Sequence, residues 1–330
     1  MHTRATFNLV AGFVYAQTLS AMVSLDLFTR LSKGPVNSET IARESGLTVR
    51  SVEVIMTAAH AIGLVDRRRL GWGLALKGAA LVGRGGIAEM VVHHTHLYAD
   101  LADPLALLRG EGPQELRAFW TYACGGKSGE GDPGPYSRLM AASQEFVADA
   151  VLHNRVFRDA RHLVDLGGGA GAFAVAALKC HEKLTVTVAD RADVVPMAEA
   201  TLAAAHLEER GQTATVDFFS GGLSFDADTI TLVRILHDHE DDAVAQLLAR
   251  LARGSPSARL VVVEPMADRR RPTGIDAYFP WYFMAMGQGR LRTFEEIRAA
   301  LHAAGYGRVK RLKSRNPTLV SCAVATVQSV

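Results

Sequence analysis

Residues 162–190, HLVDLGGGAGAFAVAALKCHEKLTVTVAD, contain an apolar run, a glycine-rich turn, an alanine-rich segment and a second β-branched run. This order predicts a buried strand, a tight turn, a helix and a second strand. The alternation continues downstream, with further strands expected at 214–219, 228–236 and 258–266. Strands that alternate with helices form a mostly parallel sheet with helices on both faces. We therefore expect an α/β fold with a doubly wound sheet, and the strand–helix–strand–strand pattern at the C-terminus predicts an antiparallel edge.

The N-terminal third has a different pattern. It predicts one helix capped by Ser38 that ends at Gly46, and a second helix capped by Thr48. Two short strands around a basic turn follow, which is a helix-turn-helix plus wing pattern. With 330 residues, more than one domain is expected. The domains we predict are a winged-helix-like dimerisation domain at 1–105, a helical connector at 106–155 that contributes to the substrate pocket, and an α/β domain at 156–330.

Composition and charge exclude several classes of protein. Apolar residues make up 48% of the chain and charged residues 21%, values that are typical of globular proteins. The formal net charge of +2 gives no reason to expect nucleic acid as a partner. Cys124, Cys180 and Cys322 stand far apart, so neither a structural zinc site nor a disulfide framework is predicted. A reducing cytoplasmic compartment fits this cysteine usage best.

Residues 5–25 carry no charge, which raises the question of a membrane segment or a signal peptide. Several polar side chains interrupt this stretch, and its apolar residues recur at roughly helical spacing. We expect a buried or subunit-interface helix, and a homodimer, because an apolar helical domain of this kind cannot bury itself alone. Peripheral contact with the inner membrane is the alternative.

The glycine-rich turn is the first candidate binding site. Gly167, Gly169 and Gly171 follow Asp165 at the end of the first expected strand. Glycines allow a tight turn and a close approach to a ligand, and the helix beyond offers free N–H groups. The G-x-G-x-G spacing differs from the G-x-G-x-x-G of NAD-binding turns. An acid before the first glycine suits a cationic ligand with an amino group, such as S-adenosylmethionine; the alternative is a purely structural turn.

Further acids follow the next two strands. Asp190 ends the second strand, where a carboxylate can accept hydrogen bonds from ribose hydroxyls. Asp217 and Phe218 follow the third strand, where they suit the edge and face of an adenine ring. The alternatives are that the acids are caps and that Phe218 is a core residue.

His237 lies at the carboxyl end of the fourth strand, within RILHDHEDD. Ligands of doubly wound sheets bind at this edge. An imidazole has a pKa near 6.5 and can accept a proton from a hydroxyl at neutral pH. A metal site is not expected, because neighbouring residues cannot all point at one ion. An incidental histidine in a turn is the other alternative.

These motifs, in this order, resemble class I small-molecule O-methyltransferases, which carry a winged-helix-like dimerisation domain in front of a Rossmann-like sheet. The segments that carry the resemblance are DLGGGAG, VAD, VDFF, LHDHEDD, VVVEPM and LRTFEEIRAALHAAGY. Other segments, among them FNLVAGFVYAQ and DAYFPWYFMAMGQGRLRT, are similar to the bacterial demethylspheroidene (hydroxyneurosporene) O-methyltransferases. That likeness implies methylation of the tertiary 1-hydroxyl of an acyclic carotenoid; a phenolic or polyketide substrate is the alternative. The chain also starts later than those relatives do.

The resemblance implies roles for individual residues. Gly167, Gly169, Gly171 and Asp165 would bind the methionine part of S-adenosylmethionine, with Asp190 on the ribose and Asp217 and Phe218 on the adenine. His237 would be the general base and Glu264 would orient it. Plant phenolic relatives place a second acid where this chain has Leu291, so the base has one acidic supporter fewer and the pocket is more apolar.

We expect the substrate pocket to be formed by aromatic and methionine side chains of the connector and of the last crossover. The candidates are Phe119, Trp120, Tyr136, Met140, Tyr282 and Met286, with Phe279, Trp281 and Met284 beside them. Ordinary core or dimer packing is the alternative for each of them. A non-catalytic binding protein, an NAD oxidoreductase and a winged-helix DNA-binding regulator are the competing classes of function.

Overall fold

The structure is a computed structural model that describes residues 2–82, 86–119, 134–220 and 222–327. The chain divides into two compact units, Met1–Thr95 and His96–Val330, which are described separately. Helix α7 (Ile87–Asp100) crosses the boundary between them. A separate connector at 106–155, as predicted from the sequence, stays a prediction.

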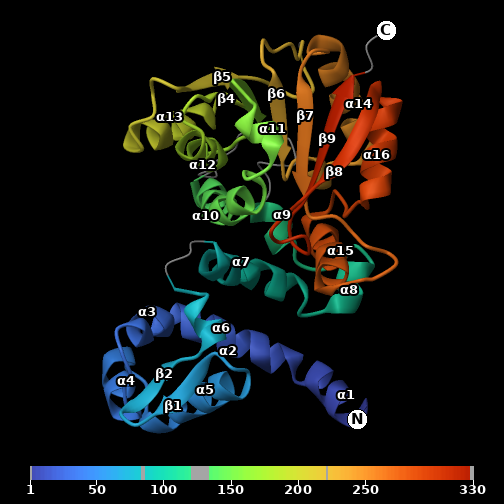
Figure 1. Cartoon of the computed structure of the whole chain (residues 1–330). Helices are drawn as coiled ribbons and strands as arrows, with labels where there is room; N and C mark the ends of the chain where they lie inside the picture. Colours follow the sequence, from blue (N-terminus) through green and yellow to red (C-terminus); the bar gives the residue numbers. More distant parts are fainter. Residues whose placement is uncertain (1, 83–85, 120–133, 221, 328–330) are drawn as a thin grey trace. The chain divides into compact units, whose positions relative to one another are not determined.

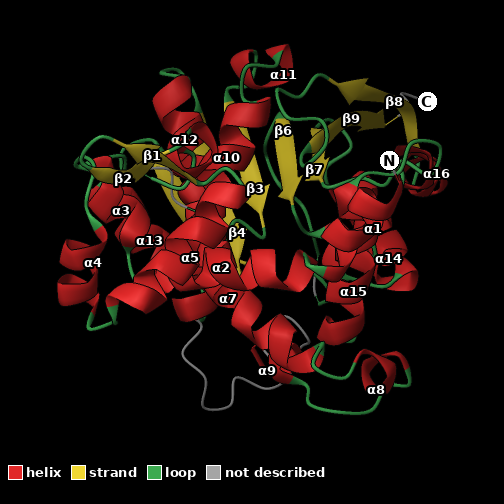
Figure 2. Ribbon diagram, turned by 90° about the horizontal axis from the view of Figure 1, so that it is seen from below, coloured by secondary structure: helices red, strands yellow, loops and turns green. Residues whose placement is uncertain are grey.

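The N-terminal unit is a small helical domain with one hairpin. Its strands β1 (Val65–Arg68) and β2 (Gly71–Leu74) pair antiparallel, and Figure 2 shows the hairpin close to α3. Its core contains Met22, Ile41, Met56 and Trp72. The helices of the unit are α1 (His2–Val10), α2 (Gly12–Ser24), α3 (Leu27–Ser32), α4 (Ser38–Ser45), α5 (Val49–Ala61) and α6 (Leu76–Ala79).

One predicted helix cap is wrong. Helix α4 is capped by Asn37, whose side chain accepts a hydrogen bond from the Thr40 N–H at 2.8 Å, and not by Ser38. Ser38 instead lies inside the first turn, where its buried hydroxyl accepts a hydrogen bond from the Trp72 indole at 3.0 Å. The predicted helix end at Gly46 and the cap at Thr48 are confirmed.

The uncharged segment 5–25 forms parts of two helices rather than one. Thr18 and Met22 of α2 are buried, whereas Phe7 and Phe13 are 64% and 71% exposed. In the part of the chain that the structure describes, no helix is both long and apolar enough to cross a membrane.

The C-terminal unit contains a seven-stranded sheet with the order β5-β4-β3-β6-β7-β9-β8 (Figure 1). Its first five strands pair in parallel, and β9 pairs antiparallel with both β7 and β8. The predicted doubly wound sheet with an antiparallel edge is therefore confirmed. The strands are β3 (His162–Leu166), β4 (Thr185–Asp190), β5 (Gly211–Thr215), β6 (Thr229–Val233), β7 (Arg259–Glu264), β8 (Tyr306–Leu312) and β9 (Ser321–Val327).

Helices cover both faces of this sheet because successive strand residues point in opposite directions. Leu163 belongs to a core with residues of α10 and α12, whereas Val164 belongs to a core with residues of α14 and α16. The helices of this unit are α8 (Pro104–Leu108), α9 (Glu115–Phe119), α10 (Gly134–Val151), α11 (Arg155–Arg158), α12 (Ala172–Cys180), α13 (Val195–Ala204), α14 (Asp241–Gly254), α15 (Gly274–Met286) and α16 (Phe294–Ala303).

The strand order reverses between β3 and β6, since β4 and β5 lie on one side of β3 and β7 lies beyond β6. Such a switch point leaves a crevice outside the carboxyl ends of the strands, where doubly wound proteins bind their ligands. The glycine turn follows β3, and the short 3-10 turn η1 (Leu236–Asp238) follows β6. The fold therefore brings the two predicted motifs to the same edge.

Candidate active site

The glycine turn connects β3 to α12 in a conformation that favours glycine. Gly167, Gly169 and Gly171 have φ angles of +77°, +56° and +78°. A Cβ atom on Gly167 would lie 2.4 Å from Cδ1 of Ile235, which stands just before the turn that carries His237. A side chain at this position would therefore both strain the backbone and separate the two motifs.

Asp165 is buried beneath the turn with one oxygen unsatisfied. The Thr231 hydroxyl donates to its Oδ1 at 2.7 Å, but its Oδ2 has no hydrogen-bond partner among the described residues. Burial raises the pKa of Asp165 to about 7, against the opposing effect of the Thr231 hydrogen bond. A buried acceptor without a donor is costly. The contact of Asp165 with the amino group of S-adenosylmethionine stays a prediction.

Asp190 joins the glycine turn to the end of β4. Its carboxylate accepts hydrogen bonds from the backbone N–H groups of Gly169 and Arg191, both at 2.8 Å. Burial raises the pKa of Asp190, although both hydrogen bonds act in the opposite direction. Asp190 is thus at the predicted place beside the turn; its contact with ribose stays a prediction.

Asp217 and Phe218 follow β5 at the same edge of the sheet. Asp217 is exposed and accepts a hydrogen bond from the Phe219 N–H at 2.8 Å, which holds the pKa of Asp217 below its usual value. Phe218 is half-buried, and its Cζ would lie 2.8 Å from a Cβ on Gly167. Phe218 therefore borders the glycine turn, and the roles of both residues toward adenine stay predictions.

His237 is buried in η1 with a carboxylate at each ring nitrogen. Its Nδ1 is hydrogen-bonded to Oε2 of Glu264, and its Nε2 lies 3.1 Å from Oδ1 of Asp238. The other oxygen of Glu264 accepts the backbone N–H groups of Ile235 and Leu236 at 2.9 and 2.7 Å. Glu264, at the end of β7, therefore fixes both the ring and the turn that carries it.

The two carboxylates decide the charge of this histidine. Burial lowers the pKa of His237, but the charges of Glu264 and Asp238 outweigh burial and raise it to about 10. The ring is therefore an imidazolium at neutral pH while no substrate is bound. It can accept a proton only after it has released the one it carries.

Helix α15 places aromatic rings beside His237. The ring centroids of Phe279 and Phe283 lie 6.3 and 5.6 Å from that of His237. Tyr282, Met286 and Phe119 belong to or pack against the same apolar cluster, and Met286 is fully buried there. Their contact with substrate stays a prediction. The remaining predicted substrate residues are Trp120, which lies outside the described residues, and Tyr136 and Met140, which belong to α10 but whose side chains are not described.

Sequence reasoning missed three residues of this site. Asp238 was considered only as part of an acidic run, although it contacts His237 Nε2. Phe283 was not among the predicted pocket residues, and Arg292 was quoted only as part of a motif. A helical projection of 274–286 places Phe279 and Phe283 on one face and could have found the second aromatic ring.

The glycine turn, its buried acids and the histidine meet at the switch point of a doubly wound sheet, where such folds bind their ligands. The family comparison identifies the class. Residues 98–307 match the O-methyltransferase domain, and residues 7–81 match the O-methyltransferase dimerisation domain. The chain therefore belongs to the O-methyltransferase family, whose methyl donor is S-adenosylmethionine. The predicted cofactor and enzyme class are thereby confirmed.

Two bacterial relatives are similar over most of the chain. The demethylspheroidene O-methyltransferase of Rhodobacter capsulatus is 38% identical, over 96% of this chain and 80% of its own length. The enzyme of the same name from Cereibacter sphaeroides is 36% identical, over 97% of this chain and 86% of its own length. The resemblance stated from the sequence is therefore confirmed.

Solved structures share the fold. Human N-acetylserotonin methyltransferase in complex with S-adenosylmethionine superposes with a TM-score of 0.82 at 22% identity, covering 100% of this chain and 98% of that one. The pyocyanin biosynthetic protein PhzM also gives 0.82 at 22% identity, covering 99% of both chains.

Proposed function

We propose that this protein methylates the tertiary 1-hydroxyl of an acyclic carotenoid, demethylspheroidene or hydroxyneurosporene, with His237 as the general base. One observation supports the role of His237 as the base. Its imidazole is buried and held by Glu264, at the same edge of the sheet as the glycine turn. Two relatives named demethylspheroidene O-methyltransferase support the substrate. The apolar surroundings support it too, since Leu291 packs against the cluster that contains Tyr282 and Phe283.

The chain's own residues have defined tasks in this reaction. Bound S-adenosylmethionine supplies a methyl group that is already activated on a sulfonium. Asp165 and Asp190 would hold the donor at the glycine turn. His237, after it has released the proton that it carries at neutral pH, would accept the substrate proton at Nε2 as the methyl group moves from sulfur to oxygen. A tertiary alcohol is far less acidic than a phenol, so the proton leaves during or after methyl transfer rather than before it. The rings on α15 exclude water from the reacting atoms.

The assembly and location follow from the same proposal. We infer a homodimer from the dimerisation domain and from the exposed apolar side chains Phe7, Leu9 and Phe13 at its start. A carotenoid dissolved in lipid reaches a cytoplasmic enzyme at the membrane surface, so we include peripheral contact with the inner membrane.

A methyl-transfer assay tests the substrate. Demethylspheroidene and 1-hydroxyneurosporene in detergent are incubated with S-adenosylmethionine beside a panel of catechols and hydroxynaphthoates, and products are identified by mass spectrometry. We expect one added methyl group on the carotenoids. Methylation of phenols alone would keep the reaction class and replace the carotenoid with a phenolic or polyketide substrate.

Replacing Asp238 with asparagine should shift the pH dependence of the reaction. The substitution removes one of the two negative charges that raise the pKa of His237, so this pKa falls. A base must be neutral, hence the rising limb of kcat/KM against pH moves to lower pH than in the wild type. Rates measured from pH 6 to about 10.5 check this expectation, because that pH range includes both the ordinary and the raised pKa of His237. An unmoved or alkaline-shifted limb would show that another group controls it.

A further inference from the structure

Four consecutive carbonyl groups of the turn that carries His237 accept hydrogen bonds from residues 288–292. Arg292 donates to the carbonyl oxygens of Leu236 at 2.6 Å and of His239 at 2.8 Å. The Arg290 backbone N–H donates to the carbonyl of His237 at 2.9 Å. The side-chain amide of Gln288 donates to the carbonyl of Asp238 at 3.0 Å. The turn is therefore held along its whole acceptor side by one short segment.

Glu264 holds the other side of this turn. It accepts the N–H groups of Ile235 and Leu236 and the ring of His237. The position of the imidazole thus depends on two fixed partners, one on the donor side and one on the acceptor side. A short 3-10 turn has few internal hydrogen bonds and needs such external partners to stay in one conformation.

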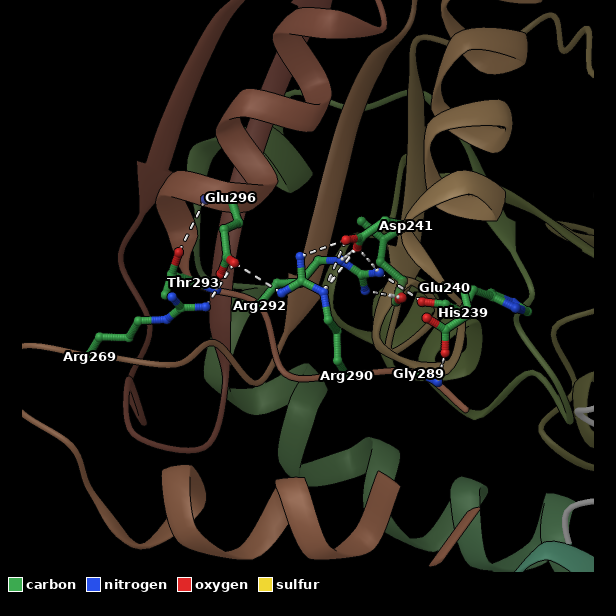
Figure 3. A network of polar contacts seen from close by, with 10 residues as sticks. His239, Glu240, Asp241, Arg269, Gly289, Arg290, Arg292, Thr293 and Glu296 are labelled. Carbon is green, nitrogen blue, oxygen red and sulfur yellow. Dashed lines mark hydrogen bonds and ion pairs between the residues drawn. The ribbon is translucent and has the colours of Figure 1, made fainter. Parts of the chain in front are cut away.

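Arg292 makes two of the four acceptor-side contacts, and Figure 3 shows it in one polar network with Asp241 and His239. It is 3% exposed, and its charge is compensated by Asp241 at the start of α14, at 2.6 Å. Its planar guanidinium reaches two carbonyls and the carboxylate at once, which a lysine ammonium on a flexible stem reproduces only in part. Both terminal nitrogens of this buried side chain donate to the His237 turn, which indicates more than a surface ion pair.

The approach of this segment to the turn is close. Gly289 has a φ of +80°, and a Cβ atom there would lie 2.2 Å from the carbonyl oxygen of His237. Its N–H donates to the Glu240 side chain at 2.9 Å. The same segment follows α15 directly, since that helix ends at the left-handed Gly287. Helix α15 carries the rings of Phe279 and Phe283 beside the ring of His237, and the segment that follows it binds the His237 carbonyl. One continuous stretch of chain therefore contacts both the side chain and the backbone of this histidine.

We propose that Arg292 is a positioning residue that holds the His237 turn at the place from which the imidazole can reach the substrate hydroxyl. This inference rests on the proposed role of His237 as the base. Arg292 does not itself touch the reacting atoms; it acts through the carbonyls of Leu236 and His239. The segment 288–292 thereby makes the orientation of the base depend on the placement of α15.

The charged groups around His237 determine whether its pKa should rise or fall when Arg292 is replaced. Glu264 faces it from β7, Asp238 and His239 from its own turn, and Arg292 from the loop before α16, while α15 presents phenyl rings. If Arg292 positions the ring against its carboxylates, its removal loosens those contacts and lowers the pKa of His237. If Arg292 acted only as a nearby positive charge, its removal would raise that pKa.

The experiment compares Arg292→Gln, Arg292→Lys and the control Arg269→Gln in the full-length protein. Arg269 is largely exposed and pairs with Glu296 at 2.9 Å, on the side of this network away from His239 (Figure 3). Methyl-transfer kinetics give kcat and KM. Imidazole ¹⁵N NMR titration gives the pKa of His237 without any substrate, assigned with His237→Gln. Thermal unfolding and S-adenosylmethionine binding establish that each variant is folded.

We expect Arg292→Gln to lower kcat by about 10²-fold, the loss typical of a small misplacement of a reacting group. The KM for S-adenosylmethionine should stay within about twofold, because binding that donor does not use this turn. Arg292→Lys should recover part of kcat, and Arg269→Gln should stay within about fivefold of the wild type, as for an exposed ion pair. The pKa of His237 should fall in Arg292→Gln alone.

Several results would overturn the proposal. They are an Arg292→Gln protein that folds and keeps kcat within about fivefold, an equal loss in Arg269→Gln, and an unchanged or raised His237 pKa. If Arg292→Gln does not fold, the same criteria apply to Arg292→Lys, which keeps the charge. A fully active His237→Gln would refute the base role instead, while the NMR titration would still decide whether Arg292 positions the ring.

Discussion

Replacing His237 with glutamine is expected to lower the rate of methyl transfer by about 10²–10⁴-fold, the contribution typical of a positioned general base. Glutamine keeps a hydrogen-bond donor for Glu264 and nearly fills the buried site, but it has no nitrogen that can take a proton at neutral pH. The glycine turn, Asp165 and Asp190 remain in place, so the affinity for S-adenosylmethionine should change little. Single-turnover rates at saturating donor measure the effect directly.

A matched control is available two residues further along. His239 belongs to the same turn, but Arg292 binds its backbone carbonyl, and its ring packs against Phe219 with centroids 5.3 Å apart. His239→Gln should therefore retain most of the activity. A loss below about tenfold in His237→Gln, with donor binding intact, would mean that proximity and orientation alone carry the reaction.

The second large effect is expected for Glu264→Gln, which should lower the rate by about 10³-fold or more, as a reversed histidine tautomer does in another enzyme. The amide oxygen can still accept the N–H groups of Ile235 and Leu236, which leaves the amide nitrogen facing Nδ1 of His237. The ring must then accept at Nδ1 and carry its proton on Nε2. The nitrogen that should receive the substrate proton is blocked.

Two consequences of this substitution oppose each other. Loss of the Glu264 charge lowers the pKa of His237, so more of the histidine is neutral at pH 7. A neutral ring in the wrong tautomer nevertheless has no lone pair at Nε2, so the tautomer decides the outcome. Kinetics and ¹⁵N NMR of the imidazole on the same protein separate the two effects. An Nδ1-protonated ring with a rate near that of the wild type would contradict this account.

Local patterns predicted most elements of the α/β sheet, but the third strand occupies Gly211–Thr215 rather than 214–219. The glycines at 167, 169 and 171 indicated a turn because few other residues adopt a positive φ. Alternation of strands and helices predicted the parallel sheet, and the sheet placed His237 at the same edge as the glycine turn. The prediction that Ser38 caps helix α4 was wrong because the neighbouring residues Asn37 and Ser38 can both cap a helix. The contact between Ser38 and Trp72, which is 34 residues away, decided between them.

The environment of His237 was decided by tertiary structure. The contact of His237 with Glu264 was predicted from the family resemblance, because no local pattern links residues that are 27 positions apart. Asp238 is the next residue in the chain, yet its position at Nε2 depends on the conformation of η1. Arg292 reaches the turn across 56 positions, and nothing in the spacing of GRLRT indicates which carbonyls it binds.

The sequence by itself thus determined the class of fold, the order of the motifs and the edge of the sheet at which they meet. It did so because backbone conformation and burial periodicity depend on residues within one or two turns of chain. Only the tertiary structure decided the charge of His237, the unsatisfied oxygen of Asp165 and the contacts of Arg292. These properties arise from burial and from hydrogen bonds between distant segments, which exist only after the sheet and its loops have packed.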